Sequence, residues 1–308
     1  MPKKKPLFIL FLLSSLLWST EATQAQPVVS QDHPHFAATS PDGILFRWDK
    51  RGNNGLYLIL PGRDTLLLLS HLRTRPQHPV WVPGKEAIVF DTGVDQNNRL
   101  VYYDLKTKQL KLLLHRKIAC REASFTPSRH LVAFSGFDDR TGGWQIFSYD
   151  FIYGNLNRLT SEKGNCLFPV FSPDGKTILY TIQDANGHSR LKSINWYGNN
   201  PKILAKNIFG KACWTPDNWR ILFVEHYGNR YLLKSIHRDG TGTAELLSLP
   251  YPACCPVEDK NGNLWLLVKP GKTFILTGIR KGKVPVKSLQ ESMLKRSTTQ
   301  DVIFQQHP

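Results

Sequence analysis

The stretch that decides the fold is Phe168–Thr181, "FPVFSPDGKTILYT", in which Phe171 stands two places before the proline of a Ser-Pro-Asp-Gly sequence. Proline presets φ for a turn, aspartate bonds its own backbone, and glycine supplies the positive φ that closes the turn. The residues that follow are rich in β-branched and aromatic side chains, which are typical of strands. The stretch therefore predicts two strands joined by a tight turn.

The turn proline and its surroundings recur along the chain. The copies are "AATSPDG" (Pro41), "PVWVPGK" (Pro83), "ASFTPSR" (Pro127), "PVFSPDG" (Pro173), "ACWTPDN" (Pro216) and "ACCPVED" (Pro256), at intervals of 42, 44, 46, 43 and 40 residues. This period is the one expected of four-stranded propeller blades. The sequence thus predicts an all-β fold, a six-bladed β-propeller of four-stranded antiparallel blades over residues 26–290.

The fourth repeat shows how each blade is expected to be built. Its predicted strands are Leu167–Ser172, Thr177–Gln183, Ser189–Asn195 and Pro201–Ala205. We name the strands of a repeat A to D, from the axis outward. Aromatic residues two places before the turn proline should wedge between neighbouring blades: Trp81, Phe125, Phe171 and Trp214. The turn aspartates are expected to form turns and not to catalyse: Asp42, Asp174 and Asp217.

With these residues in view, the chain resembles the TolB-type, WD40-like propeller repeat family. The resemblance rests on "SPDG" at Ser40–Gly43 and Ser172–Gly175, and on the C-to-D segments Ile146–Thr160 and Leu232–Ser248. It covers about Phe36 to Leu289 and implies the propeller fold. The TolB protein itself has an additional α/β domain ahead of its propeller, whereas here the first repeat begins about ten residues after the predicted signal peptide. The resemblance therefore concerns the propeller part only.

The two ends of the chain are expected to lie outside the blades. Three lysines, Lys3–Lys5, precede an apolar stretch from Leu7 to Trp18, and Thr23 and Ala25 suit a cleavage site, so residues 1–25 are predicted to be a signal peptide. The apolar stretch is shorter than the roughly 20 residues of a membrane-spanning helix. We expect a periplasmic or secreted monomer with no transmembrane segment in the mature chain. Residues 291–308 are expected to be a tail that packs on or closes the ring.

The charge is strongly positive, with 40 Lys and Arg against 24 Asp and Glu and a formal net charge of +16. These basic residues are scattered, which favours loose association with acidic envelope polymers. No recognition motif accompanies them, so no specific nucleic-acid binding is expected. The chain also lacks Gly-x-Ser-x-Gly, His-Glu-x-x-His, P-loop and Cys-x-x-Cys motifs. A non-enzymatic protein without a cofactor is the first expectation.

Propeller topology places the D-to-A linkers and the B-to-C loops on one face. Seven of the ten histidines fall in these loops: His33, His35, His71, His78, His115, His188 and His226. They are either ordinary solvated side chains or a binding rim around the channel mouth, where a divalent metal could bind. The positions five to eight residues before each turn proline should lie closest to the axis. They supply the candidate binding residues His33, His35, His78, Arg121, Glu122, Asn165, Lys211 and Tyr251.

Five cysteines remain open to two interpretations. They are either buried thiols, or Cys213 forms a bridge with Cys254 or Cys255 across two blades. For function, the leading hypothesis is a scaffold in the cell envelope that binds a protein or peptide at the channel mouth. The alternative is a metal-dependent lyase or hydrolase that acts on an acidic oligosaccharide through channel histidines, since some lyases have a related propeller fold.

Overall fold

The computed structural model describes residues 34–39, 44–50, 53–59, 65–69, 76–93, 97–259, 262–269 and 275–279. The regular elements in these ranges are β-strands joined by short turns. No segment within them forms a helix with the length and apolar character needed to cross a membrane. The predicted signal peptide at residues 1–25, His33 and the tail at residues 291–308 lie outside the described residues.

The strands form antiparallel sheets in chain order. The first two sheets contain β1 (Pro34–Thr39), β2 (Ile44–Lys50), β3 (Asn53–Ile59) and β4 (Thr65–Leu69), then β5 (Gln77–Trp81), β6 (Ala87–Thr92), β7 (Arg99–Asp104) and β8 (Leu110–Leu112). The next two contain β9 (Cys120–Phe125), β10 (Leu131–Asp138), β11 (Gly143–Asp150) and β12 (Leu156–Arg158), then β13 (Asn165–Phe171), β14 (Thr177–Gln183), β15 (Ser189–Asn195) and β16 (Lys202–Lys206). The last two contain β17 (Cys213–Trp214), β18 (Arg220–Tyr227), β19 (Arg230–His237) and β20 (Ala244–Leu249), then β21 (Ala253–Glu258), β22 (Leu264–Val268) and β23 (Ile275–Ile279).

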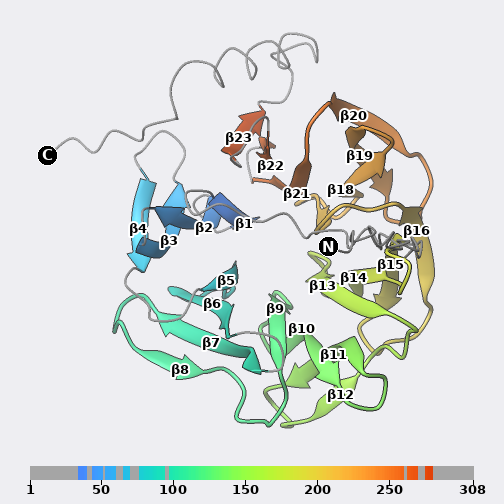
Figure 1. The fold of residues 1–308 in the computed structure, drawn as a ribbon. Coiled ribbons are helices and arrows are strands. Elements are labelled where there is room, and N and C mark those ends of the chain that lie inside the picture. The colour runs from blue at the N-terminus through green and yellow to red at the C-terminus, as the bar shows by residue number, and fades with distance from the viewer. Residues whose placement is uncertain are drawn as a thin grey trace, which may run out of the picture.

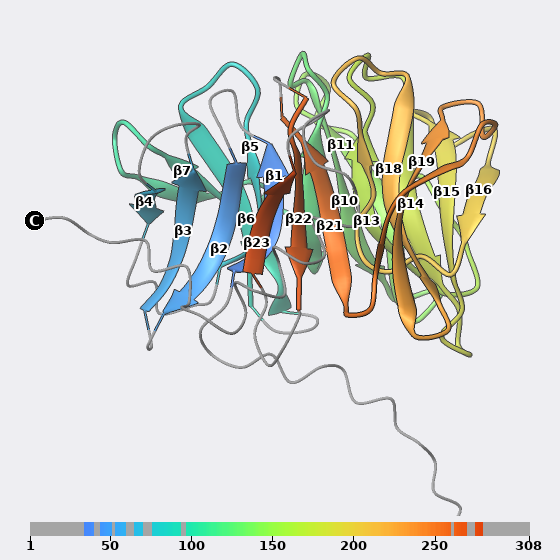
Figure 2. The same ribbon diagram turned by 90° about the horizontal axis from the view of Figure 1, so that it is seen from above.

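The sheets stand around a common centre, with the first strand of each sheet innermost and the last outermost (Figure 1). Seen from the side, the strands run roughly along the axis of the ring (Figure 2). The inner strand β1 contacts β5 on one side and β21 on the other. The predicted all-β architecture of four-stranded antiparallel sheets is therefore confirmed, although the sheet β21–β23 has three strands among the described residues.

The apolar core is divided among the interfaces between neighbouring sheets. One cluster joins Leu131 and Ile146 of the third sheet to Phe171 and Ile178 of the fourth. The next joins Leu179 of the fourth sheet to Trp214 and Phe223 of the fifth. The indole nitrogen of Trp214 also donates to the carbonyl oxygen of Val170, at 3.3 Å. The predicted wedging of the repeat aromatics between blades is confirmed at Phe171 and Trp214.

The Ser-Pro-Asp-Gly turn has the hydrogen bonds that its sequence predicts. Ser172 Oγ donates to Asp174 Oδ1 at 2.5 Å, and the same carboxylate oxygen accepts from the Lys176 backbone N–H at 3.1 Å. Gly175 has φ +69° and its N–H donates to the Ser172 carbonyl at 2.8 Å. Only glycine adopts this φ without strain. The interpretation of Asp174 as a turn former is confirmed.

The sixth repeat requires a correction of register. Pro256 lies inside β21, so it is not the proline of a turn between strands A and B. The turn comes later, where the Gly262 N–H donates to the Asp259 carbonyl at 2.9 Å and Gly262 has φ +76°, matching Gly175 and Ser172 of the fourth repeat. The prediction was wrong because Pro256 corresponds to Pro169, which follows the inner-strand bulge described below.

Candidate functional site: a pocket at the channel mouth

A β-bulge interrupts the inner strands of the propeller at equivalent positions. The pairing register shifts between Gln77 and Val80, between Arg121 and Ser124, between Leu167 and Val170, and between Cys254 and Val257. At each bulge one residue that is not glycine has a positive φ: His78 (44°), Glu122 (61°), Phe168 (56°) and Cys255 (54°). Such residues cost of order 1–3 kcal/mol each and cluster where a protein binds or reacts. The bulges therefore mark the inner strands as a candidate site.

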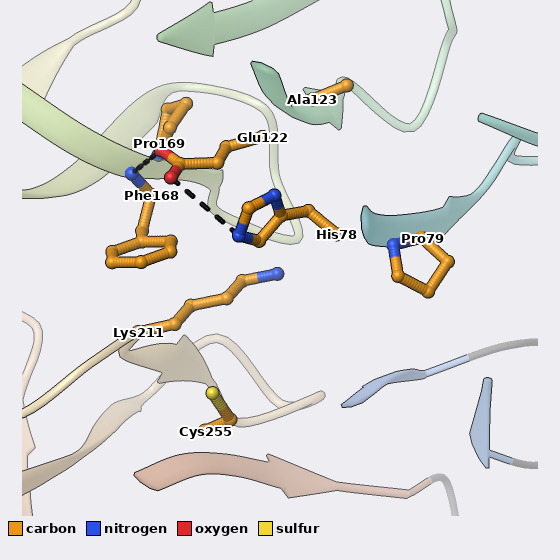
Figure 3. A pocket seen from close by; sticks show the side chains of 8 residues that line it. All are labelled: His78, Pro79, Glu122, Ala123, Phe168, Pro169, Lys211 and Cys255. Atoms are coloured by element: carbon orange, nitrogen blue, oxygen red, sulfur yellow. Dashed lines mark hydrogen bonds and ion pairs between the residues drawn. The ribbon is translucent and has the colours of Figure 1, made fainter. Parts of the chain in front are cut away.

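The side chains at these bulges meet in one pocket (Figure 3). It is lined by His78, Pro79, Glu122, Ala123, Phe168, Pro169, Lys211 and Cys255. Lys211 precedes β17 and lies five residues before Pro216, so it is the counterpart of the bulge residues in the fifth repeat. Five successive sheets thus contribute one equivalent residue each. The pocket is narrow and admits only small groups.

Carboxylates of the pocket hold the bulges in place. The Nδ1 atom of His78 is 2.8 Å from Asp91 Oδ1, and the same oxygen accepts from the Glu122 backbone N–H at 3.1 Å. Glu122 Oε2 in turn accepts from the Phe168 backbone N–H and from Ser135 Oγ, both at 2.6 Å. A bulge removes an N–H from the strand ladder, and a buried N–H needs another acceptor. Each carboxylate here satisfies the bulge of the next sheet, so Glu122 and Asp91 have a structural role.

Arg121 lies beside the pocket. Its Nε atom is 3.5 Å from Glu122 Oε1, and its guanidinium carbon is 4.1 Å from the centre of the Trp144 ring. His78 Nε2 is 3.9 Å from the same Glu122 oxygen, and the His78 ring meets the Phe168 ring edge-on at 5.7 Å. A guanidinium at this distance from an indole face gains a cation–π attraction. Arg121 is therefore held against Trp144 and Glu122.

Lys211 and Cys255 form the opposite side of the pocket, with the lysine side chain between the Phe168 ring and Cys255 (Figure 3). Burial lowers the pKa of the Lys211 ammonium, against the interactions with Cys255 and Glu122, which favour its protonated form. The thiol of Cys254 donates to Cys255, and this hydrogen bond together with the Lys211 charge lowers the pKa of Cys255. The pocket thus combines a cation, a thiol and an aromatic wall.

The structure brings together three of the eight predicted binding residues, His78, Glu122 and Lys211, in the pocket itself. Arg121 lies next to it, whereas Asn165 is exposed at the start of β13, where its Oδ1 accepts from the Trp144 N–H at 3.0 Å. The remaining residues are elsewhere or not described. Tyr251 is buried in the core between the fifth and sixth sheets, the backbone of His35 lies in β1, and His33 lies outside the described residues.

The position of Tyr251 follows from the register error at Pro256. Counting from the true turn, the residue equivalent to Phe168 is Cys255, and it lies in the pocket. Phe168 and Cys255 are the site residues that sequence reasoning missed. A signal was present: His78, Phe168 and Cys255 each precede a proline, and proline inside a strand marks a bulge because it has no N–H to donate to the ladder.

Among the described histidines His78 reaches the pocket. His188 pairs with Asp184 at 3.5 Å, and His226 stacks on Tyr231 with ring centres 4.5 Å apart. His115 is exposed between β8 and β9. Within the described ranges no group of three His, Cys, Asp or Glu side chains is placed to hold a metal ion.

All five cysteines are free thiols in the structure. Burial raises the pKa of Cys120 to about 11 and that of Cys166 and Cys213 to about 12. These values keep the three groups protonated at neutral pH, as expected of thiols that fill space between blades. Neither of the bridges considered for Cys213 is present.

The fold and the pocket can now be compared with known proteins. The family described as "TolB beta propeller domain" matches residues 65–253, which is more than half of the chain. The chain belongs to the TolB β-propeller family. A curated relative, "Tol-Pal system protein TolB" from Anaeromyxobacter dehalogenans (strain 2CP-C), is 32% identical over 111 residues, which is 35% of this chain and 25% of the relative. The aligned part therefore spans about a quarter of that relative's length.

Two solved structures share the propeller fold with this TolB-family chain. TolB from Acinetobacter baumannii has a TM-score of 0.59 and 22% identity, with 68% of this chain and 53% of that chain covered. An oligogalacturonate lyase in complex with manganese has a TM-score of 0.53 and 14% identity, with 72% of this chain and 66% of that chain covered. At these identities the similarity establishes the architecture alone.

Proposed function

We propose that this TolB-family chain is a non-enzymatic binding scaffold that takes a protein or peptide at the channel mouth, on the face of the D-to-A linkers. The observation that carries the proposal is the pocket to which five sheets contribute one equivalent residue each. Four of these residues hold a positive φ without being glycine. Strained backbone of this kind is found at functional sites, and here it holds side chains of different chemistry around the axis.

The proposed compartment is the bacterial periplasm or the outside of the cell. It rests on the signal-peptide pattern of residues 1–25 and on membership of a family whose relatives are named as Tol-Pal system proteins. Cleavage after Ala25 would leave Gln26 as the first residue, and the intact mass of the exported protein would test this. A mass that includes the apolar stretch would contradict the proposed cleavage.

The proposed ring has six blades over residues 26–290. Contacts of β1 with both β21 and β22 support closure between the first and the sixth sheet. The sixth sheet would then need a fourth strand from another part of the chain, and residues 291–308 are the proposed tail that packs on or closes the ring. We propose a monomer, because the blades of a propeller present only short outer strand edges to other chains.

The face assignment is tested by comparing charge reversals on the two faces of the ring. Arg121→Glu and the exposed Arg140→Glu lie on the proposed binding face, whereas Lys176→Glu lies in a turn on the opposite face. Partners are captured from an envelope extract by crosslinking to the wild type, then quantified for each variant. We expect strong loss with both arginine variants and none with Lys176→Glu. Arg140→Glu should show this loss at unchanged thermal stability, because Arg140 is exposed, whereas Arg121→Glu also removes the ion pair with Glu122. Equal loss from the two faces would contradict the proposed function.

The alternative function, a metal-dependent lyase acting on an acidic oligosaccharide, is supported by the fold similarity to the manganese-bound oligogalacturonate lyase. Among the described histidines, His78 lines the pocket, and its Nδ1 atom lies 2.8 Å from Asp91 Oδ1. A divalent metal retained stoichiometrically after dialysis, and lost in His78→Ala, would favour the lyase over the scaffold. Absence of retained metal together with partner capture would favour the scaffold.

A further inference from the structure

The ammonium group of Lys211 stands apart from the other charged groups of the channel. Within the described chain it makes no hydrogen bond and no ion pair, although it lies in the pocket and keeps only partial solvent access. Lysines on the third strands of the fourth and fifth sheets behave differently: Lys192 pairs with Glu162, and Lys234 pairs with Glu225 at 2.5 Å. A partly buried cation without a direct hydrogen bond or ion pair loses hydration that more distant charges offset only in part.

The nearby carboxylates of Glu122 and Asp91 interact with other groups, and no described hydrogen bond or ion pair joins either of them to Lys211. Glu122 Oε2 accepts from Ser135 and from the Phe168 N–H, and Glu122 Oε1 faces Arg121 and His78. Asp91 Oδ1 accepts from the Glu122 N–H and is bonded to His78. Lys211 is thus the cation that the pocket's own carboxylates leave without a direct partner.

The other groups around Lys211 define what could approach it. Phe168, Pro79 and Pro169 form apolar walls, and the narrow interior excludes a bulky ring. The neighbouring Cys255 and Glu122 favour the protonated form of the lysine, against the effect of burial. A small anion with an apolar stem matches this combination better than a neutral or cationic group does.

We propose that the pocket binds a carboxylate carried by the partner protein or peptide, with Lys211 as its charge partner and Phe168 as the apolar wall. This inference rests on the proposed function and names the chemistry that the channel mouth recognises. The carboxylate belongs either to an acidic side chain or to a C-terminus, and both offer the same planar anion.

The test uses the full chain and small probes. Saturation-transfer NMR measures the binding of N-acetyl-aspartate N-methylamide (a side-chain carboxylate), of N-acetylglycine (a C-terminal carboxylate), and of N-acetyl-asparagine N-methylamide as the neutral control. We expect one or both carboxylates to bind and the asparagine probe not to bind. Whichever carboxylate binds more tightly identifies the source. Binding of all three probes alike, or of none, would overturn the proposal.

Variants assign the binding to Lys211. Lys211→Gln should weaken the carboxylate by about tenfold or more, as expected for loss of a charge-assisted hydrogen bond. Lys211→Arg should retain binding because it keeps the charge, and Lys192→Gln is the matched control, since that lysine is already paired with Glu162. Equal weakening in Lys192→Gln, or none in Lys211→Gln, would contradict the role of Lys211.

The same variants separate this inference from the proposed function. If Lys211→Gln captures partners as well as the wild type does while Arg121→Glu does not, the binding face stands and the carboxylate pocket is wrong. If charge reversal on neither face changes partner capture, while the carboxylate probe still binds and its binding depends on Lys211, the proposed scaffold function is wrong and the anion site remains.

Discussion

Two positions that recur among the described repeats have similar positive φ values and very different residues. In the turns between strands A and B, positive φ values occur at Gly84, Arg129, Gly175, Asn218 and Gly262, between 61° and 76°. In the inner-strand bulges they occur at His78, Glu122, Phe168 and Cys255, between 44° and 61°. Glycine and asparagine are the residues that tolerate this conformation best. The turns mostly follow that preference, and the bulges do not.

The difference in residue type indicates that the turns have a structural role and that the bulges belong to the candidate site. A turn at the surface needs only a backbone conformation, so the residue with the lowest strain suffices. A bulge beside the channel holds a side chain at the axis, and the chain accepts strain of about 1–2 kcal/mol per residue to keep that side chain. The bulge residue differs from repeat to repeat while its φ stays similar. We therefore infer that the side chains at the bulges serve the function of the protein.

The largest expected loss of stability comes from a substitution in the turn between strands A and B of the fourth repeat. Gly175→Val forces a β-branched residue to φ +69° and brings its Cβ to 3.3 Å from Pro127 Cδ and 3.6 Å from Thr126 Cγ2. Strain of about 1–3 kcal/mol and crowding against the third sheet should both lower the free energy of unfolding, measured in urea. Partner capture by the folded fraction should be unchanged.

A substitution at a second glycine distinguishes backbone strain from crowding as the cause of the loss. Gly142 has φ +65°, but a Cβ there meets nothing within 4 Å. Gly142→Val should therefore lose stability through backbone strain alone, and by less than Gly175→Val. If the two variants lose the same amount, the packing against Thr126 and Pro127 contributes nothing.

The next effect is at the carboxylate that supports a bulge. Glu122→Gln replaces an oxygen that accepts from both Ser135 and the Phe168 N–H, and it removes the ion pair with Arg121. Loss of charge-assisted hydrogen bonds in a buried site should cost about 1–3 kcal/mol in the free energy of unfolding. The control is Glu225→Gln, whose carboxylate forms a more exposed pair with Lys234 and should matter little. Equal losses would show that Glu122 does not hold the bulge.

A smaller effect is expected at a bulge residue itself. Cys255→Gly relieves a strained φ of 54° and removes one buried thiol. Relief of about 1–2 kcal/mol of strain should offset the lost packing, so the midpoint of urea unfolding should stay close to that of the wild type. A severe loss of stability would place Cys255 with the turn glycines as a structural requirement, and would break the distinction between turn and bulge.

The smallest effect concerns the charge of the turn aspartate. Burial opposes ionisation of Asp174, but hydrogen bonds from Ser172, the Lys176 N–H and Asn218, together with the Arg238 charge, lower its pKa. Because the folded pKa lies below the unfolded value of about 3.9, the charge stabilises the fold above about pH 4. That contribution is lost as the pH falls through the folded pKa. Asp174→Asn keeps the side-chain oxygen that forms the turn, so it should cost about 1 kcal/mol or less near pH 7.

The pH dependence gives the check for Asp174. The difference in unfolding free energy between wild type and Asp174→Asn should be largest at neutral pH and shrink toward acid. A difference that stays constant from pH 7 down to pH 2 would mean that the charge plays no part in the turn.

The strands were largely predictable from sequence, and the fourth repeat shows why. Thr177–Gln183 and Ser189–Asn195 were predicted with the bounds that β14 and β15 have in the structure. Turn chemistry fixed their ends, and β-branched residues between turns fixed their type. The first strand was expected at Leu167 and begins at Asn165, because pairing with β14 extends to Gln183 and no local signal marks that end.

The candidate site was predictable only in part. Counting back from the turn prolines found His78, Glu122 and Lys211, because the repeat carries the same strand to the same distance from the axis. The count failed at Tyr251, where Pro256 was taken as a turn proline although it follows a bulge. A bulge inverts the alternation of side chains along a strand, so neither period-two patterning nor composition reveals which residue faces the channel.

The sequence by itself determined the repeat, its turns and the order of its strands, because these depend on residues close together in the chain. It also determined the wedging of Phe171 and Trp214, since the residue two places before a turn keeps its face of the strand. Tertiary structure decided that Phe168 and Cys255 join His78, Glu122 and Lys211, and that the Lys211 ammonium has no direct partner among the described residues. Those residues lie in different repeats, and only the packing of the sheets around one axis brings their side chains into one pocket. There Asp91 and Glu122 accept hydrogen bonds from the backbone of the next sheet, whereas no described group accepts one from the Lys211 ammonium.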